Sequence, residues 1–160
     1  MADPLTLTTA IITIAGAVCK SYDEISKIVT LVRQASKEVE GIQFRASSIN
    51  SIVLNLKQAL EEATIRDVIG KDALALKHVE ALDQPLKATQ STLGDVLGML
   101  NKQYKLASNG KTYKVRWQYY LNTSDWVVLQ SRLRDHIQVL GTSMQGLNTS
   151  VMHSSHKPTL

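Results

Sequence analysis

Apolar residues recur at alternating steps of three and four along most of this chain, and that spacing places them on one side of an α-helix. The most regular stripe consists of Val39, Ile42, Ala46, Ile49, Val53, Leu56 and Leu60. Three further stripes lie within residues 11–32, 79–104 and 126–151. Narrow stripes suit long helices that pack side by side at a shallow angle. We therefore predict an all-α fold, an antiparallel helical bundle of four main helices with a short helix at residues 113–121, before the last one.

Composition agrees with one aliphatic core. The chain has 160 residues, of which 44% are hydrophobic, 20% charged and 5% aromatic. This balance is typical of globular proteins. We expect a single helical-bundle domain over residues 1–152 and a flexible C-terminal tail over residues 153–160. Gly70 is expected to separate the second and third helices, and Pro85 to kink or break the third.

The first part of the chain is unusually free of charge. No charged residue occurs from Pro4 to Cys19, a run of 16 residues. As a helix this run is about 24 Å long, whereas a bilayer core needs about 30 Å. We expect burial in the core or conditional insertion rather than spanning. The residues that would contact lipid on insertion are Leu5, Leu7, Ile11, Ile12, Ile14 and Val18.

A basic stretch lies in the second half of the chain. Between Asp95 and Asp125 no acidic residue occurs, and the stretch holds Lys102, Lys105, Lys111, Lys114 and Arg116. Such a patch favours anionic lipid headgroups or nucleic-acid phosphates, although a solvated loop explains it as well. Nucleic acid is not the favoured partner, because the nearby rings of Trp117, Tyr119 and Tyr120 suit a bundle end or a membrane interface better.

The sequence predicts no enzyme, no cofactor and no metal site. Residues 70–72 lack the glycine and hydroxyl residues of a phosphate-binding loop. His153 and His156 lack further ligands for zinc. Cys19 lies in an apolar helix and is expected to be an inert thiol. A single cysteine and the absence of a cationic start to a signal peptide favour a cytoplasmic location.

Two segments together resemble a known family. Residues 1–5 (Met-Ala-Asp-Pro-Leu) precede a small-residue apolar helix that reaches Gly16 and Ala17, and residues 114–117 (Lys-Val-Arg-Trp) precede a helix carrying Leu129, Leu133, Arg134, His136 and Leu140. This arrangement, over about residues 1–150, resembles the fungal N-terminal domain of STAND (NLR-like) proteins, which is grouped with the HeLo and HeLo-like cell-death domains.

The resemblance implies a helical bundle that stays silent until a partner domain oligomerises, and that then targets a membrane through its N-terminal helix. It implies self-association or a STAND-type partner, and possible contact with anionic lipids. The threonines at positions 6, 8, 9 and 13 interrupt the apolar run and are expected to weaken insertion. The alternative left open is a protein–protein adaptor bundle without membrane activity.

Overall fold

The computed structural model describes residues 3–31, 37–108 and 123–155, and these ranges contain helices and no strand. The helices are α1 (Pro4–Leu31), α2 (Lys37–Glu61), α3 (Ala63–Lys71), α4 (Ala73–Glu80), α5 (Asp83–Ser108) and α7 (Thr123–Ser155). The predicted all-α class is confirmed for these residues.

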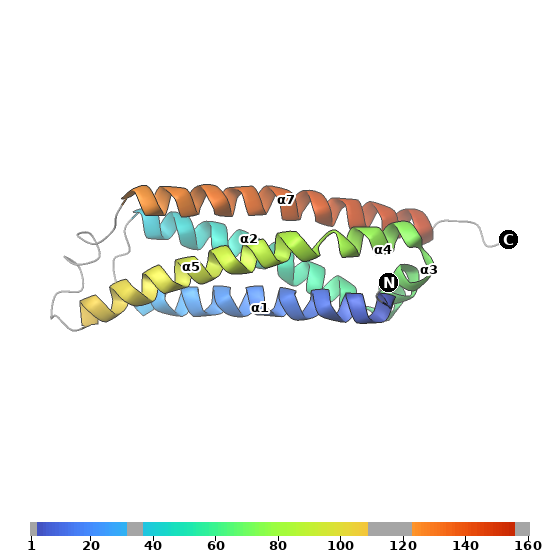
Figure 1. Ribbon diagram of the computed structural model, residues 1–160, viewed down its shortest axis with the longest axis horizontal. Coiled ribbons are helices and arrows are strands. Elements are labelled where there is room, and N and C mark those ends of the chain that lie inside the picture. The colour runs from blue at the N-terminus through green and yellow to red at the C-terminus, as the bar shows by residue number, and fades with distance from the viewer. Residues whose placement is uncertain (1–2, 32–36, 109–122, 156–160) are drawn as a thin grey trace.

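Long helices lie side by side along the axis of the molecule (Figure 1). α1 packs against α2 and α5, and α7 packs against the same two helices. α1 and α5 run in one direction while α2 and α7 run in the other, so α1/α2 and α5/α7 are antiparallel neighbours and α1/α5 and α2/α7 are parallel ones (Figure 1). The arrangement thus differs from a bundle with only antiparallel neighbours. The short helices α3 and α4 cause this difference, because they carry the chain across one end of the molecule.

The buried face of α2 is the one that the spacing predicted. All seven stripe residues, from Val39 to Leu60, are buried. The stripes of the other long helices supply most of the remaining core, and Ile14, Tyr22, Leu97, Ile137, Met144 and Val151 pack against it while partly buried. Among the residues that the structure describes, Trp126 is the largest side chain with no exposed surface.

The third predicted helix is two helices. α4 ends at Glu80, and α5 begins at Asp83 with Pro85 in its first turn. Proline suits this position because the first N–H groups of a helix have no partner within it. The predicted break is therefore confirmed at the start of α5.

Residues 62–72 fold differently from the expectation. The sequence suggested a boundary at Gly70, but Gly70 lies inside α3. α3 has nine residues and only Ile69 is buried, so its apolar pattern is too short to show a period. The boundary falls at Asp72, whose carboxylate accepts hydrogen bonds from the backbone N–H groups of Leu74 and Ala75 and so caps α4.

The C-terminal end of the described chain is longer than expected. α7 continues through Ser155, three residues into the predicted tail. The rest of that tail and the short helix predicted at residues 113–121 lie outside the described residues.

Candidate functional site

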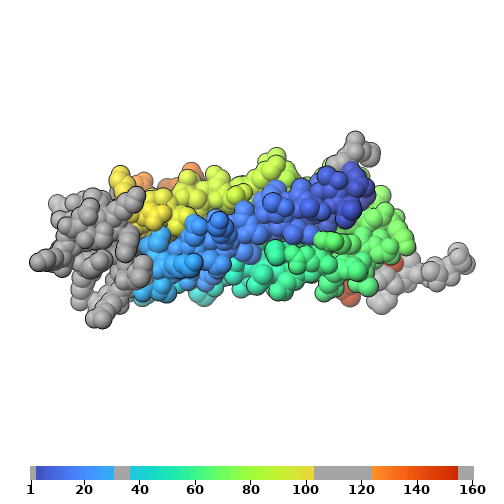
Figure 2. Space-filling view, turned by 90° about the horizontal axis from the view of Figure 1, so that it is seen from below, coloured from blue at the N-terminus to red at the C-terminus, as the bar shows by residue number. Residues whose placement is uncertain are grey.

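α1 carries the features that the sequence singled out, and its two sides differ sharply. One side faces the core through Ile11, Ala15 and Val18, none of which has exposed surface. The opposite side of the same turns is exposed and carries small uncharged residues, namely Thr6, Thr9, Ala10 and Thr13. This side of α1 lies on the surface between α5 and α2 (Figure 2). We call these four residues the outer face of α1.

The predicted lipid-contacting residues are mostly core residues in this structure. Ile11 and Val18 are fully buried, and Leu7, Ile12 and Ile14 are partly buried against the core. Leu5 alone of the six is exposed, at 59%. The structure thus places all six on one helix but leaves only Leu5 open to a membrane while α1 remains in the bundle.

Three of the four threonines near the start of α1 donate their hydroxyls to the helix's own backbone, whereas the hydroxyl of Thr6 donates to the Asp3 carboxylate at 3.5 Å. The hydroxyl of Thr8 donates to the carbonyl of Pro4 at 2.7 Å, that of Thr9 to Leu5 at 2.9 Å, and that of Thr13 to Thr9 at 2.9 Å. A hydroxyl bonded in this way carries much less cost into an apolar medium than an unpaired one. The expectation that these threonines weaken insertion therefore loses part of its physical basis.

α1 is longer than the uncharged run within it. The helix has 28 residues, about 42 Å at about 1.5 Å per residue. Its span from Pro4 to Thr30 is long and apolar enough to cross a membrane, and no other helix in the described ranges meets that criterion. Core helices of soluble proteins and signal sequences meet it too. The expectation against spanning was based on the uncharged run alone, whereas the helix continues beyond Cys19 through a segment that contains Lys20 and Lys27.

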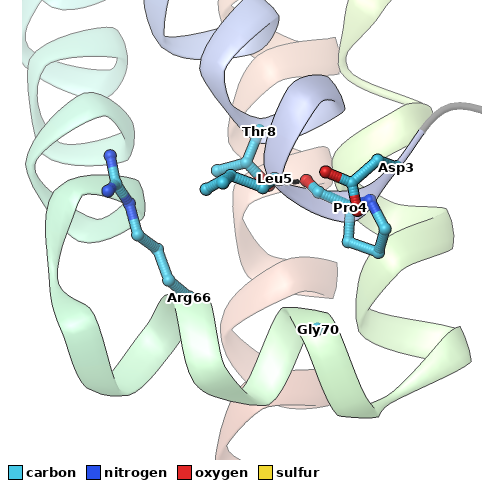
Figure 3. Close-up of a pocket in the computed structure, with 6 residues that line it drawn as sticks. All are labelled: Asp3, Pro4, Leu5, Thr8, Arg66 and Gly70. Carbon is cyan, nitrogen blue, oxygen red and sulfur yellow. Dashed lines mark hydrogen bonds between the residues drawn. The ribbon is translucent and has the colours of Figure 1, made fainter.

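The start of α1 lies over a hollow. Asp3, Pro4, Leu5 and Thr8 of the α1 end, together with Arg66 and Gly70 of α3, line a cavity of about 300 Å³ (Figure 3). A hydrogen bond fixes the side chain of Arg66, because its Nε donates to the carbonyl of Leu60 at 2.9 Å. The first turn of α1 is therefore less closely packed than the turns that carry Ile11 and Val18.

The predicted basic site is only partly described. Lys102 is exposed near the end of α5, and Lys105 lies in the same helix. Lys111, Lys114 and Arg116 lie outside the described residues. Because α1 and α5 run parallel, Lys102 lies toward the Leu31 end of α1, far from Leu5 (Figure 1). Leu5 and Lys102, the exposed members of the two predicted membrane contacts in the described residues, can therefore meet one membrane only if the long side of the bundle, formed by α1 and α5, faces it.

Sequence reasoning missed two cations on α1. Lys20 and Lys27 are exposed and follow the uncharged run on the same helix. They lie on the long side that also carries the outer face of α1. Their position could have been inferred, because residues 13, 20 and 27 are spaced by seven and so lie on one face of a helix.

Two titratable side chains in the helices have altered pKa values. Burial raises the pKa of the Cys19 thiol, Asp23 raises it further, and Lys57 opposes them. Burial lowers the pKa of His136, the nearby Asp135 raises it, and Arg132 lowers it further.

Within the described part of the chain, no group of three or more His, Cys, Asp or Glu residues could hold a metal ion.

Comparisons with protein-family models, curated proteins and solved structures give no match. The family resemblance therefore rests on the residues quoted above and stays a prediction.

Proposed function

We propose that this chain is a non-enzymatic effector or signalling domain of the HeLo-like kind, from the N-terminal part of a fungal STAND-type (NLR-like) protein. In this proposal it resides in the cytoplasm and acts in programmed cell death or heterokaryon incompatibility. Self-association or a STAND-type partner domain activates it, and α1 then engages a membrane that carries anionic lipids.

The observation that supports this proposal best is the exposure of α1. Only 22% of its most apolar 18-residue window is buried. A helix that serves only as a core element usually hides such a window and carries charge on its outer side. Here the outer face of α1 carries no charge over residues 6–13, and Lys20 and Lys27 follow on the same side farther along the helix. The hydroxyls of Thr9 and Thr13 are bonded within the helix.

The core side of α1 explains why such a domain would stay silent. Ile11, Val18, Ile25 and Val29 are buried, and burial of side chains of this size stabilises a fold by about 1.5–3 kcal/mol each. Releasing all four would cost about 6–12 kcal/mol, comparable to the whole stability of a typical domain, about 5–15 kcal/mol. Transfer of the same side chains into lipid recovers that cost. Oligomerisation would therefore have to hold α1 close to a membrane.

Charge placed on the outer face of α1 tests the proposal without disturbing the core. We expect the double variant Thr9→Glu/Thr13→Glu to fold normally, because both positions are exposed and glutamate favours helices more than threonine does. The chain fused to a trimeric coiled coil should float with phosphatidylserine-containing vesicles, and the variant should not. The fused chain without substitutions should bind more weakly to vesicles of phosphatidylcholine alone than to vesicles that contain phosphatidylserine.

The matched control places the same charges on another helix. Ser51 and Asn55 of α2 are exposed and four residues apart. Ser51→Glu/Asn55→Glu adds equal charge and should leave flotation unchanged. If both double variants lose flotation equally, repulsion from anionic lipid explains the effect and α1 is not the contacting element.

The basic stretch is tested separately. Replacement of Lys102, Lys105, Lys111, Lys114 and Arg116 by glutamine should weaken binding to anionic vesicles and reduce its salt dependence, because each cation near such a surface contributes about 1 kcal/mol. If the oligomerised chain ignores anionic vesicles, the membrane proposal is wrong and the adaptor interpretation replaces it.

A further inference from the structure

The side of the bundle formed by α2 and α7 carries no formal charge over much of its length. α2 has no charged residue from Ala46 to Leu56, and α7 has none from Ile137 to Met152. The exposed side of a surface helix ordinarily carries charged residues. Here the two uncharged runs lie on neighbouring helices, because α2 and α7 pack against each other in parallel (Figure 1).

Contacts between α2 and α7 show which of their residues lie at the same level. The side-chain amide of Gln130 donates from Nε2 to the carbonyl of Glu38 at 3.4 Å, and a Cβ at Gly41 would lie 3.4 Å from Oε1 of the same amide. Since both helices rise by the same distance per residue, Ser51 lies near the level of Gly141. The two uncharged runs are therefore side by side.

Amide, hydroxyl and aromatic side chains are exposed on these runs. They belong to Ser51 and Asn55 of α2, to Gln138 and Gln145 of α7, and to Phe44, which precedes Ser51 by seven residues and so lies on the same side of α2. Phe44 is the only phenylalanine of the chain, and 72% of it is exposed. We call these five residues the α2–α7 face. Depletion of charge together with an exposed aromatic side chain is typical of the centre of a protein–protein interface.

The chemistry of the α2–α7 face suits a second copy of the same chain. The chain has a formal net charge of +4, so two copies repel each other over most of their surfaces. An uncharged face avoids like-charge contacts when it meets its own copy. Each amide group holds both a donor and an acceptor, so glutamine and asparagine can pair with the same residues of a copy. A strongly acidic or basic partner would find no complementary charge here.

The size of this surface indicates a weak contact. The run from Ile137 to Met152 is about 24 Å long at about 1.5 Å per residue, and two packed helices are about 20 Å wide. A copy on this surface would bury about 500 Å² on each side, or about 1,000 Å² in total, which is the lower limit for a specific interface. Such pairing depends on concentration, so a partner domain that gathers several copies would promote it.

We propose that the α2–α7 face is a self-association surface, on which a second copy of this chain packs through the same residues. The proposal rests on the self-association named in the proposed function and gives it a location. Because α2 and α7 lie opposite the side formed by α1 and α5, pairing leaves the outer face of α1 uncovered. The two outer faces then point away from each other, so one pair brings one α1 to a given membrane.

This surface and the membrane contact of α1 can be tested separately. In the vesicle experiments the coiled coil holds the copies together, so Ser51→Glu/Asn55→Glu should lose pairing through the α2–α7 face and still float. The pairing experiments use the chain without coiled coil or lipid. Their failure would overturn the self-association surface alone, and failure of flotation would overturn the membrane contact alone.

Sedimentation equilibrium tests the pairing. We expect a monomer–dimer equilibrium that Ser51→Glu/Asn55→Glu weakens by at least about tenfold, because the new charges meet their own copies. Thr9→Glu/Thr13→Glu adds the same charge on α1 and should not weaken pairing. Both variants lower the net charge from +4 to +2 (4 − 2), which by itself reduces repulsion between copies. A monomer at every soluble concentration, unchanged pairing in Ser51→Glu/Asn55→Glu, or equal weakening in both variants would overturn the proposal.

A further variant removes apolar surface without adding charge. Phe44→Ser should weaken pairing several-fold, because aromatic side chains contribute strongly at the centre of an interface. Its urea unfolding should resemble that of the wild type, since Phe44 is exposed. Wild-type pairing in Phe44→Ser would contradict the assignment of Phe44 to the contact.

Spin labels locate the contact while all five residues of the α2–α7 face are kept. In the Cys19→Ser protein, single labelled cysteines replace Gln58 of α2 or Thr13 of α1, both of which are exposed. In the dimer, two labels at position 13 should be about 40 Å apart, because four helix layers of about 10 Å separate them. Two labels at position 58 should be clearly closer. Equal distances, or the reverse order, would overturn the proposal.

Discussion

Single side chains on the buried face of α2 carry much of the stability of this bundle. Ile49 and Val53 have no exposed surface, while Ser51 between them is exposed. This alternation could be predicted from the sequence because a seven-residue stripe over 25 helical residues allows only one buried side. Partners of polar residues could not be predicted in this way. The bond between Thr92 and His136 joins residues 44 positions apart and depends on how α5 meets α7.

Replacing Ile49 or Val53 by aspartate should unfold the protein or come close to it. An unpaired buried charge costs about 3–5 kcal/mol, a large share of the stability of a typical domain. Ser51→Asp should change the free energy of unfolding by less than about 0.5 kcal/mol. Urea unfolding followed by circular dichroism gives both values. Wild-type stability of Val53→Asp would show that the wrong face of α2 has been assigned to the core.

The thiol of Cys19 should react slowly in the folded protein. Burial and Asp23 raise its pKa, so less thiolate is present at neutral pH than in the unfolded chain. Since Cys19 is the only cysteine, the rate of reaction with a disulfide reagent reports on this position alone. We expect a several-fold increase in rate after unfolding in guanidinium. Equal rates in the two states would contradict the packing of α1 described here.

At the scale of helices, the long elements could be predicted and the short ones could not. α2 and α7 show their stripes over many turns, and the break before Pro85 has a local cause. α3 and α4 have nine and eight residues, and their position depends on the Asp72 cap and on packing at the bundle end. Asp72 also accepts a hydrogen bond from Ser154 at the far end of α7. The parallel neighbours follow from these two short helices.

Removing the Asp72 cap should weaken that end of the bundle. Asp72→Ala deletes the acceptor for the N–H groups of Leu74 and Ala75 and for Ser154. Loss of a helix cap costs about 0.5–2 kcal/mol. Asp72→Asn keeps a capping oxygen and should recover most of the loss in urea unfolding. If alanine and asparagine are equally destabilising, the cap is not the source of the effect.

A Cβ added at a glycine inside a helix would meet open space at some positions and a neighbouring side chain at others. A Cβ at Gly94 or Gly98 of α5 would meet nothing within 4 Å, whereas one at Gly146 of α7 would lie 3.0 Å from Cε1 of His78. We expect Gly94→Ala and Gly98→Ala each to stabilise the protein by up to about 1 kcal/mol. Gly146→Ala should gain less or destabilise, because the imidazole must move. Equal gains at Gly94 and Gly146 would contradict the contact between α4 and α7.

In the whole molecule, the two sides of α1 have different surroundings. Its core side packs against α2 and α5, and its opposite side lies on the surface of the molecule (Figure 2). That exposed side is uncharged at residues 6, 9, 10 and 13 and carries Lys20 and Lys27 farther along. The sequence indicated the uncharged run, but only the structure shows which residues face outward. The basic residues that are described lie toward the other end of α1, so engagement with a membrane should begin with the bundle lying on its side.

The depth of α1 in lipid shows whether this helix is the element that enters the membrane. A single cysteine at Thr13, in the Cys19→Ser protein, carries an environment-sensitive dye, and the same dye at Ser51 of α2 is the control. With the oligomerised chain on phosphatidylserine-containing vesicles, we expect brominated acyl chains to quench the dye at position 13 and to leave position 51 unchanged. Binding to the vesicles without quenching at position 13 would contradict the account, because α1 would then remain outside the hydrocarbon.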